Sequence, residues 1–91
     1  MSQKRVEVEY CGRVHGVGFR YTVVDAAAKF MITGYVKNLD NGKVAVIAEG
    51  EEEILRTFLD NIYLIMQRYI EKYSINWSDF TGEFKSFEIR Y

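Results

Sequence analysis

The segment GYVKNLDNGKVAVIAEG, residues 34–50, carries the pattern that decides the fold of this 91-residue chain. Residues 35–37 form a short β-prone run, and Val44, Val46 and Ala48 alternate with their neighbours as in a β-strand. The Asn41-Gly42 pair between the two runs favours a hairpin turn, because both residue types tolerate positive φ. The segment therefore predicts two antiparallel strands joined by a tight turn over residues 40–42.

The chain before this hairpin predicts one strand and one helix. Residues 6–9 alternate valine with glutamate, which is typical of a half-buried strand. Residues 21–31 place apolar side chains three and four positions apart, which predicts a helix with one apolar stripe. Gly34 is expected to end that helix region.

A second helix is predicted to begin at residues 51–53, three glutamates that suit the positive end of a helix dipole. A solvated helix start explains these carboxylates better than paired acid and base catalysts do. Their helix buries an apolar face formed by Ile54, Leu55, Phe58, Leu59 and Ile62. No glycine or proline marks its end, which is expected between Leu64 and Ile70.

Two further alternating runs, residues 73–78 and 87–91, predict the remaining strands. The order is then β-α-β-β-α-β, with the last strand segment either single or split in two. This order predicts an α+β, ferredoxin-like (split β-α-β) sandwich, with two helices packed on one face of an antiparallel sheet. One domain is expected over residues 1–91.

Composition excludes several classes of protein. The net charge of −1 and the pI near 5.8 argue against a nucleic-acid or anionic-lipid partner. Residues 62–66, the longest apolar stretch, are too few to cross a membrane, and the N-terminus does not resemble a signal peptide. Cys11 is the only cysteine, which fits a reducing compartment. These features predict a cytoplasmic protein.

The segment RVHGVGFR, residues 13–20, follows the first strand and contains the first candidate site. Gly16 and Gly18 allow a turn whose backbone N–H groups converge on an anion at a helix N-terminus. Arg20 adds a planar fork of donors that matches phosphate oxygens. The alternative is a tight connection beside a solvated arginine, and spacing alone does not separate the two. Neither the dinucleotide-binding nor the P-loop glycine motif is matched.

Asn38 is the second candidate. Asparagine is depleted in strands, and the predicted turn does not need this one because Asn41 and Gly42 already form it. Its amide carries a donor and an acceptor, which can hold a water molecule in a chosen orientation. A strand-end cap or a solvated side chain is the ordinary alternative.

Three segments together resemble the acylphosphatase family: GRVHGVGFR at residues 12–20, TGYVKNLDNGKVAVIAEG at residues 33–50 and GEFKSFEIRY at residues 82–91. The resemblance implies an enzyme that hydrolyses the carboxyl–phosphate bond of acyl phosphates to a carboxylate and inorganic phosphate. It implies no metal, no organic cofactor and a small-molecule substrate. Because the loop that contains Gly16 and Gly18 suits a tetrahedral anion, inorganic phosphate or sulfate is expected to compete with the substrate, and a monomer is sufficient.

The same resemblance implies a role for each site residue. Arg20 would bind the phosphoryl group, and Asn38 would orient the attacking water. The backbone N–H groups that complete the phosphate cradle would be those of His15, Gly16, Val17, Gly18, Phe19 and Arg20. His15 stands where the family often has glutamine, and it is expected to contribute its backbone only. The family's Gly-Pro after the second helix is replaced here by other residues within 62–68.

Rival functions come from other classes. An RNA recognition motif has the same element order but needs stacking aromatics in its third strand, and residues 43–50 contain none. A regulatory ligand-binding domain would not need both Arg20 and Asn38. A third alternative is an acylphosphatase-like domain within a larger maturation enzyme.

Overall fold

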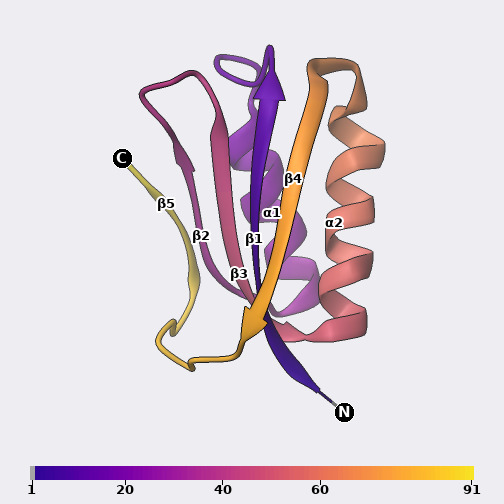
Figure 1. The fold of residues 1–91 in the computed structure, drawn as a ribbon, viewed down its shortest axis with the longest axis vertical. Coiled ribbons are helices and arrows are strands. Elements are labelled where there is room, and N and C mark those ends of the chain that lie inside the picture. The colour runs from indigo at the N-terminus through magenta and orange to yellow at the C-terminus, as the bar shows by residue number, and fades with distance from the viewer. Residues whose placement is uncertain (1) are drawn as a thin grey trace.

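Both helices lie on one face of a five-stranded sheet, as Figure 1 shows. The computed structural model describes residues 2–91. Its elements are β1 (Gln3–Gly12), α1 (Phe19–Phe30), β2 (Thr33–Asn38), β3 (Val44–Glu51), α2 (Glu52–Met66), the 3₁₀ turn η1 (Gln67–Tyr69), β4 (Ile70–Asp79) and β5 (Phe87–Arg90). No helix in this part of the chain is long and apolar enough to span a bilayer.

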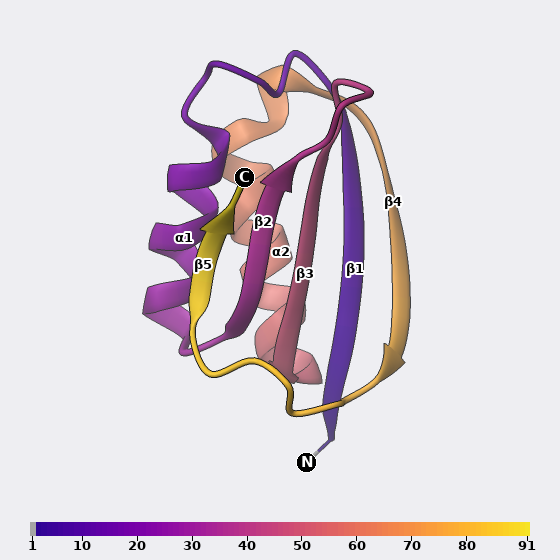
Figure 2. The same cartoon turned by 90° about the vertical axis from the view of Figure 1, so that its left-hand side faces the viewer.

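The strand order in the sheet is β4-β1-β3-β2-β5 (Figure 2). The first four strands pair antiparallel, whereas β5 pairs parallel with β2. The ferredoxin-like α+β fold is therefore confirmed, and the last strand segment is split into β4 and β5 at opposite edges. Because β5 runs parallel to β2, the sheet is mixed, and the prediction of a wholly antiparallel sheet is wrong at this edge.

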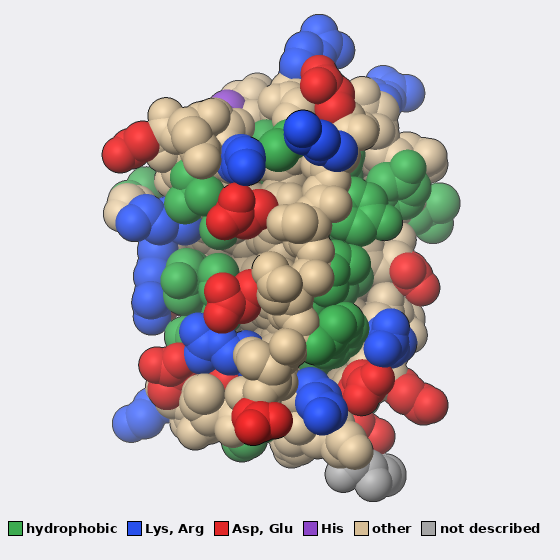
Figure 3. Space-filling view, in the orientation of Figure 1, with side chains coloured by type: hydrophobic (Ala, Val, Ile, Leu, Met, Phe, Trp, Pro, Cys, Tyr) green, Lys and Arg blue, Asp and Glu red, His purple; other side chains and the backbone are tan. Residues whose placement is uncertain are grey.

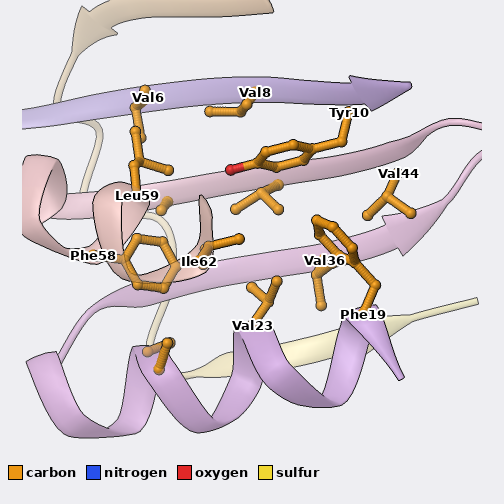
Figure 4. Close-up of a cluster of buried hydrophobic side chains, with 14 of the residues drawn as sticks. Val6, Val8, Tyr10, Phe19, Val23, Val36, Val44, Phe58, Leu59 and Ile62 are labelled. Carbon is orange, nitrogen blue, oxygen red and sulfur yellow. The ribbon is translucent and has the colours of Figure 1, made fainter. Parts of the chain in front are cut away.

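The core lies between the sheet and the two helices (Figure 4). β3 is central, so its residues Val44–Ala48 are buried on both faces of the sheet. Phe19 from α1 and Phe58 from α2 are both about 1% exposed or less, and they pack into the same apolar cluster. Burying side chains of this size stabilises a fold by about 1.5–3 kcal/mol each, which fixes both helices against the sheet.

The predicted helix boundaries differ from the observed ones at one end. α1 begins at Phe19, two residues before the predicted start, because Gly18 adopts the left-handed conformation with φ 77° and turns the chain directly into the helix. It ends at Phe30, followed by Met31 at φ 55°. α2 ends at Met66 and continues into η1, within the predicted interval.

A buried carboxylate holds the long connection between β4 and β5. Glu49 of β3 is 1% exposed and accepts hydrogen bonds from the Thr81 hydroxyl (2.7 Å), the Thr81 N–H (3.1 Å) and the Gly82 N–H (2.9 Å). Arg5 lies 3.4 Å from the same carboxylate. Burial alone would raise the pKa of Glu49, but these hydrogen bonds and the Arg5 charge outweigh it and hold the pKa below the ordinary value. The connection is thereby fixed across the sheet, and it delivers β5 to the edge beside α1.

Candidate functional site

The topology brings the two candidate segments to one end of the sheet. β1 and β2 both pair antiparallel with β3, so they run in the same direction and end on the same side. The glycine loop, defined here as residues 13–18, follows β1, and Asn38 is the last residue of β2. The connection after β1 and the end of β2 both lie toward the upper end of the molecule in Figures 1 and 2. In Figure 3 the same end carries Lys and Arg side chains, acidic side chains and the histidine.

Backbone conformation explains the two glycines of the loop. Gly16 has φ 74° and Gly18 has φ 77°, both in the left-handed region that side-chain-bearing residues rarely adopt. A Cβ added at either position would meet nothing within 4 Å. The backbone angle, rather than crowding, is therefore what requires glycine at both positions.

The loop leads into a helix N-terminus that lacks a side-chain cap. The first backbone hydrogen bond of α1 runs from Thr22 N–H to Gly18 C=O at 3.0 Å, which leaves the N–H groups of residues 19–21 without a helical partner. The first turn of α1 contains no Asp or Glu, whereas α2 begins with Glu52 and Glu53. The N-terminus of α1 is thus a site of uncompensated positive potential that favours an anion.

A small pocket of about 150 Å³ lies between the glycine loop, the start of α1 and the end of β2. It is about half the lower bound of roughly 300 Å³ for sites that enclose drug-sized ligands. It suits a small group such as a phosphoryl group, with the rest of a substrate outside. Its lining residues are Val14, Gly16, Gly18, Phe19, Arg20, Tyr21 and Asn38.

Asn38, which lines this pocket, carries one of two buried side-chain oxygens that have no hydrogen-bond partner among residues 2–91, the other being that of Asn61. A buried acceptor without a donor costs about 1–3 kcal/mol, so a strand-end cap or a solvated side chain does not describe it. A donor that reached this oxygen when a substrate binds, such as a water molecule, would satisfy it.

Arg20 reaches the same pocket from the first turn of α1. Its guanidinium forms no ion pair with any residue in the described chain, and its only aromatic neighbour there is Tyr91, whose ring centroid lies 5.2 Å from the guanidinium carbon. The donor fork of Arg20 is therefore not neutralised by a carboxylate. Tyr91 was not a predicted site residue, because only the parallel pairing of β5 with β2 places it there.

The family model described as Acylphosphatase matches residues 6–89, which is nearly the whole chain. The chain belongs to the acylphosphatase family. It is an enzyme of this family, whose members act on acyl phosphates.

Individual acylphosphatases agree with this assignment. The acylphosphatase of Geobacillus thermodenitrificans is 43% identical over 89 residues, which cover 97% of this chain and 95% of that protein. The crystal structure of the acylphosphatase from Bacillus subtilis superposes with a TM-score of 0.87 at 32% identity, and the match covers 97% of this chain and 99% of that one. The RNA-recognition and regulatory alternatives are therefore not supported.

A larger protein contains a similar unit. The crystal structure of full-length HypF, in its phosphate- and nucleotide-bound form, matches 98% of this chain with a TM-score of 0.84 at 25% identity. The match covers 12% of the HypF chain. The acylphosphatase fold is thus found both as a whole protein of about this length and as a small part of a longer one.

The acylphosphatase pocket contains four of the six residues whose N–H groups were predicted to form the cradle: Gly16, Gly18, Phe19 and Arg20. His15 and Val17 do not line it. The His15 ring turns instead toward the β2–β3 hairpin, where Nε2 lies 2.9 Å from the carbonyl oxygen of Lys43. The sequence predicted a backbone role for His15 and gave no sign of this side-chain contact. Across residues 2–91, no group of three or more His, Cys, Asp or Glu side chains could hold a metal ion.

Proposed function

We propose that the chain hydrolyses acyl phosphates in the pocket between Arg20 and Asn38. The phosphoryl group binds the guanidinium of Arg20 and the N–H groups of residues 15–20. A water molecule attacks phosphorus, the bond between phosphorus and the carboxylate oxygen breaks, and the products are a carboxylate and inorganic phosphate. The proton released by the water passes to the products or to solvent.

Two neighbouring features support binding of the phosphoryl group. The N-terminus of α1 offers unpaired N–H groups and no acidic side chain, and Gly16 and Gly18 adopt the left-handed conformation in the loop before it. Arg20 supplies a full positive charge without a competing carboxylate. Charge-assisted and bidentate hydrogen bonds of this kind are about twice as strong as neutral ones. A tetrahedral dianion can accept hydrogen bonds from both the N–H groups of α1 and the guanidinium of Arg20.

Asn38 is proposed to orient the attacking water. Its buried side-chain oxygen accepts a hydrogen bond from that water, which directs the water's lone pair toward phosphorus. Asn38 lines the pocket from the end of β2, a different element from those of the phosphate cradle. This division lets one element bind the anion while the other positions the nucleophile.

The reaction needs no strong base in this arrangement. A carboxylate is a good leaving group, and a loose phosphoryl-transfer transition state requires little help from the nucleophile. Positioning and stabilisation of the developing charge then supply most of the rate enhancement. We propose that neither a metal nor an organic cofactor takes part.

The observation that carries the proposal is that Asn38, whose side-chain oxygen is buried without a partner, lines the same pocket as Arg20 and the start of α1. The test is hydrolysis of a synthetic acyl phosphate, benzoyl phosphate, by the purified chain in the presence of EDTA. Turnover well above the background rate is expected, with competitive inhibition by inorganic phosphate and by sulfate. A rate equal to background, with the protein folded, would refute the proposal.

We further propose that the chain acts in the cytoplasm as a monomer. Its single free cysteine suits a reducing compartment, and the pocket is completed by residues of one chain. Light scattering coupled to gel filtration should give the mass of one chain at concentrations where the enzyme is active.

A further inference from the structure

A side-chain hydrogen bond connects the glycine loop to the β2–β3 hairpin. Nε2 of His15 lies 2.9 Å from the backbone carbonyl oxygen of Lys43, 28 residues further along the chain. A carbonyl oxygen can only accept, so the hydrogen must be on Nε2. His15 is therefore the donor, as either the Nε2–H neutral tautomer or the imidazolium.

The acceptor of this bond is closely connected to Asn38. The Lys43 carbonyl also accepts the N–H of Leu39 at 2.8 Å, and Leu39 directly follows Asn38. Asn38 in turn pairs with Val44, the residue after Lys43. One carbonyl oxygen thus receives a bond from the hairpin residue beside Asn38 and a bond from the loop that precedes Arg20.

The His15–Lys43 hydrogen bond, called the tether below, restricts the backbone of the glycine loop. Gly16 and Gly18 give its backbone more conformational freedom than other residues would. On its β1 side the loop is held by the Arg13 N–H, which donates to the Tyr69 carbonyl at 2.9 Å. That bond connects the loop to η1 rather than to β2, so it does not fix the distance between the loop and Asn38.

We propose that His15 is a positioning residue, whose ring N–H fixes the phosphate-binding loop at the correct distance and angle from Asn38. This inference rests on the proposed function, because it assumes that the loop binds the phosphoryl group and that Asn38 orients the water. In this role the His15 ring contacts neither the phosphoryl group nor the attacking water. Because Nε2 carries a hydrogen and donates to Lys43, that nitrogen does not serve as the general base.

The role makes a specific kinetic prediction. The cradle is local to the loop and the start of α1, so phosphate affinity should depend little on the tether. In-line attack depends on the distance and angle between the glycine loop and Asn38, so kcat should depend on the His15–Lys43 hydrogen bond. Replacing His15 by Leu removes the donor and should lower kcat by about 3- to 10-fold, the range expected for one hydrogen bond, with phosphate affinity changed by less than about twofold.

His15→Gln is the matched variant, because its side-chain amide keeps an N–H donor at similar reach. It should restore most of the kcat lost in His15→Leu. The inference is overturned if His15→Leu turns over benzoyl phosphate as fast as the unmodified chain, if His15→Gln is as slow as His15→Leu, or if phosphate affinity falls by the same factor as kcat.

An NMR measurement separates this inference from the proposed function. In the unmodified protein, a sample labelled with ¹⁵N and ¹³C should show His15 with its hydrogen on Nε2 and with a coupling across the hydrogen bond to the Lys43 carbonyl carbon. If the chain shows no turnover but this signature is present, the proposed function fails and the tether stands. If turnover is normal and Nε2 carries no hydrogen, the tether fails and the proposed function stands.

Discussion

The guanidinium of Arg20 stacks on the ring of Tyr91, with 5.2 Å between the guanidinium carbon and the ring centroid. The two residues are 71 positions apart, and the parallel pairing of β5 with β2 brings them together. Tyr91 is 86% exposed, so the contact lies at the surface of the protein. A cation–π contact of this kind favours orientations in which the guanidinium lies over the ring.

Replacing Tyr91 by Leu should therefore weaken phosphate binding by about 2- to 5-fold, because an exposed cation–π contact is worth about 0.5–1 kcal/mol. Tyr91→Phe keeps the ring and should bind phosphate like the unmodified chain. Isothermal calorimetry with inorganic phosphate provides both values. Equal affinity in all three proteins would show that the stacking does not position Arg20.

Arg20→Lys should weaken phosphate binding and turnover together. Lysine keeps the positive charge but replaces the planar donor fork by a single ammonium group. The expected loss in each quantity is about 10-fold or more, equivalent to roughly 1.4 kcal/mol. Arg68→Lys, an exposed change in η1, is the matched control and should alter neither quantity. If Arg20→Lys binds phosphate with normal affinity, Arg20 is not part of the phosphate cradle.

Asn38→Ala should lower kcat by about 10²–10³, the typical cost of losing one preorganised polar group at a transition state. Affinity for inorganic phosphate should stay near its original value, because the amide is proposed to bind water and not the anion. Asn76→Ala changes an exposed asparagine of β4 and serves as the control. Loss of phosphate binding with normal turnover of bound substrate would contradict the assignment.

Glu49 makes stability depend on pH. Its pKa is lower in the folded protein than its ordinary value of 4.5, so the ionised carboxylate stabilises the fold above that value. This contribution is lost as the pH falls below 4.5 and through the lower pKa of the folded state. Urea denaturation should therefore show the free energy of unfolding decreasing over that acid range.

Glu49→Gln should lose about 1–3 kcal/mol of stability at pH 7, because an amide cannot accept all three hydrogen bonds from Thr81 and Gly82. Its stability should then fall less steeply with acid than that of the unmodified chain. Glu88→Gln, at an exposed ion pair with Arg90, should change stability by less than about 0.5 kcal/mol. If the free energy of unfolding falls equally with acid in all three proteins, the buried carboxylate of Glu49 is not the source of the pH dependence.

The sequence was sufficient for the fold class, because its signals are local. Alternation in residues 44–48 and the Asn41-Gly42 turn identify the hairpin, and the apolar spacing after Gly18 identifies α1. The start of α1 was placed two residues late because Phe19 and Arg20 precede the periodic stripe, and only the left-handed angle of Gly18 shows where the helix begins.

The remaining features depend on long-range pairing. β5 lies parallel to β2 because the Glu49-anchored connection crosses the sheet, and no local pattern in residues 80–91 indicates its direction. The Tyr91 contact with Arg20 follows from that pairing, and the His15 contact with Lys43 follows from the shared direction of β1 and β2. Arg20 and Asn38 were found from their residue types and the family resemblance, and the structure places both at one pocket.

In the proposed reaction, water attacks the phosphorus of an acyl phosphate bound between Arg20 and Asn38. The point of attack can be determined by hydrolysing benzoyl phosphate in ¹⁸O-labelled water and analysing both products by mass spectrometry. Attack at phosphorus gives one ¹⁸O atom in inorganic phosphate per turnover and unlabelled benzoate. Label in the benzoate carboxylate would place the attack at the carbonyl carbon and refute the proposed reaction.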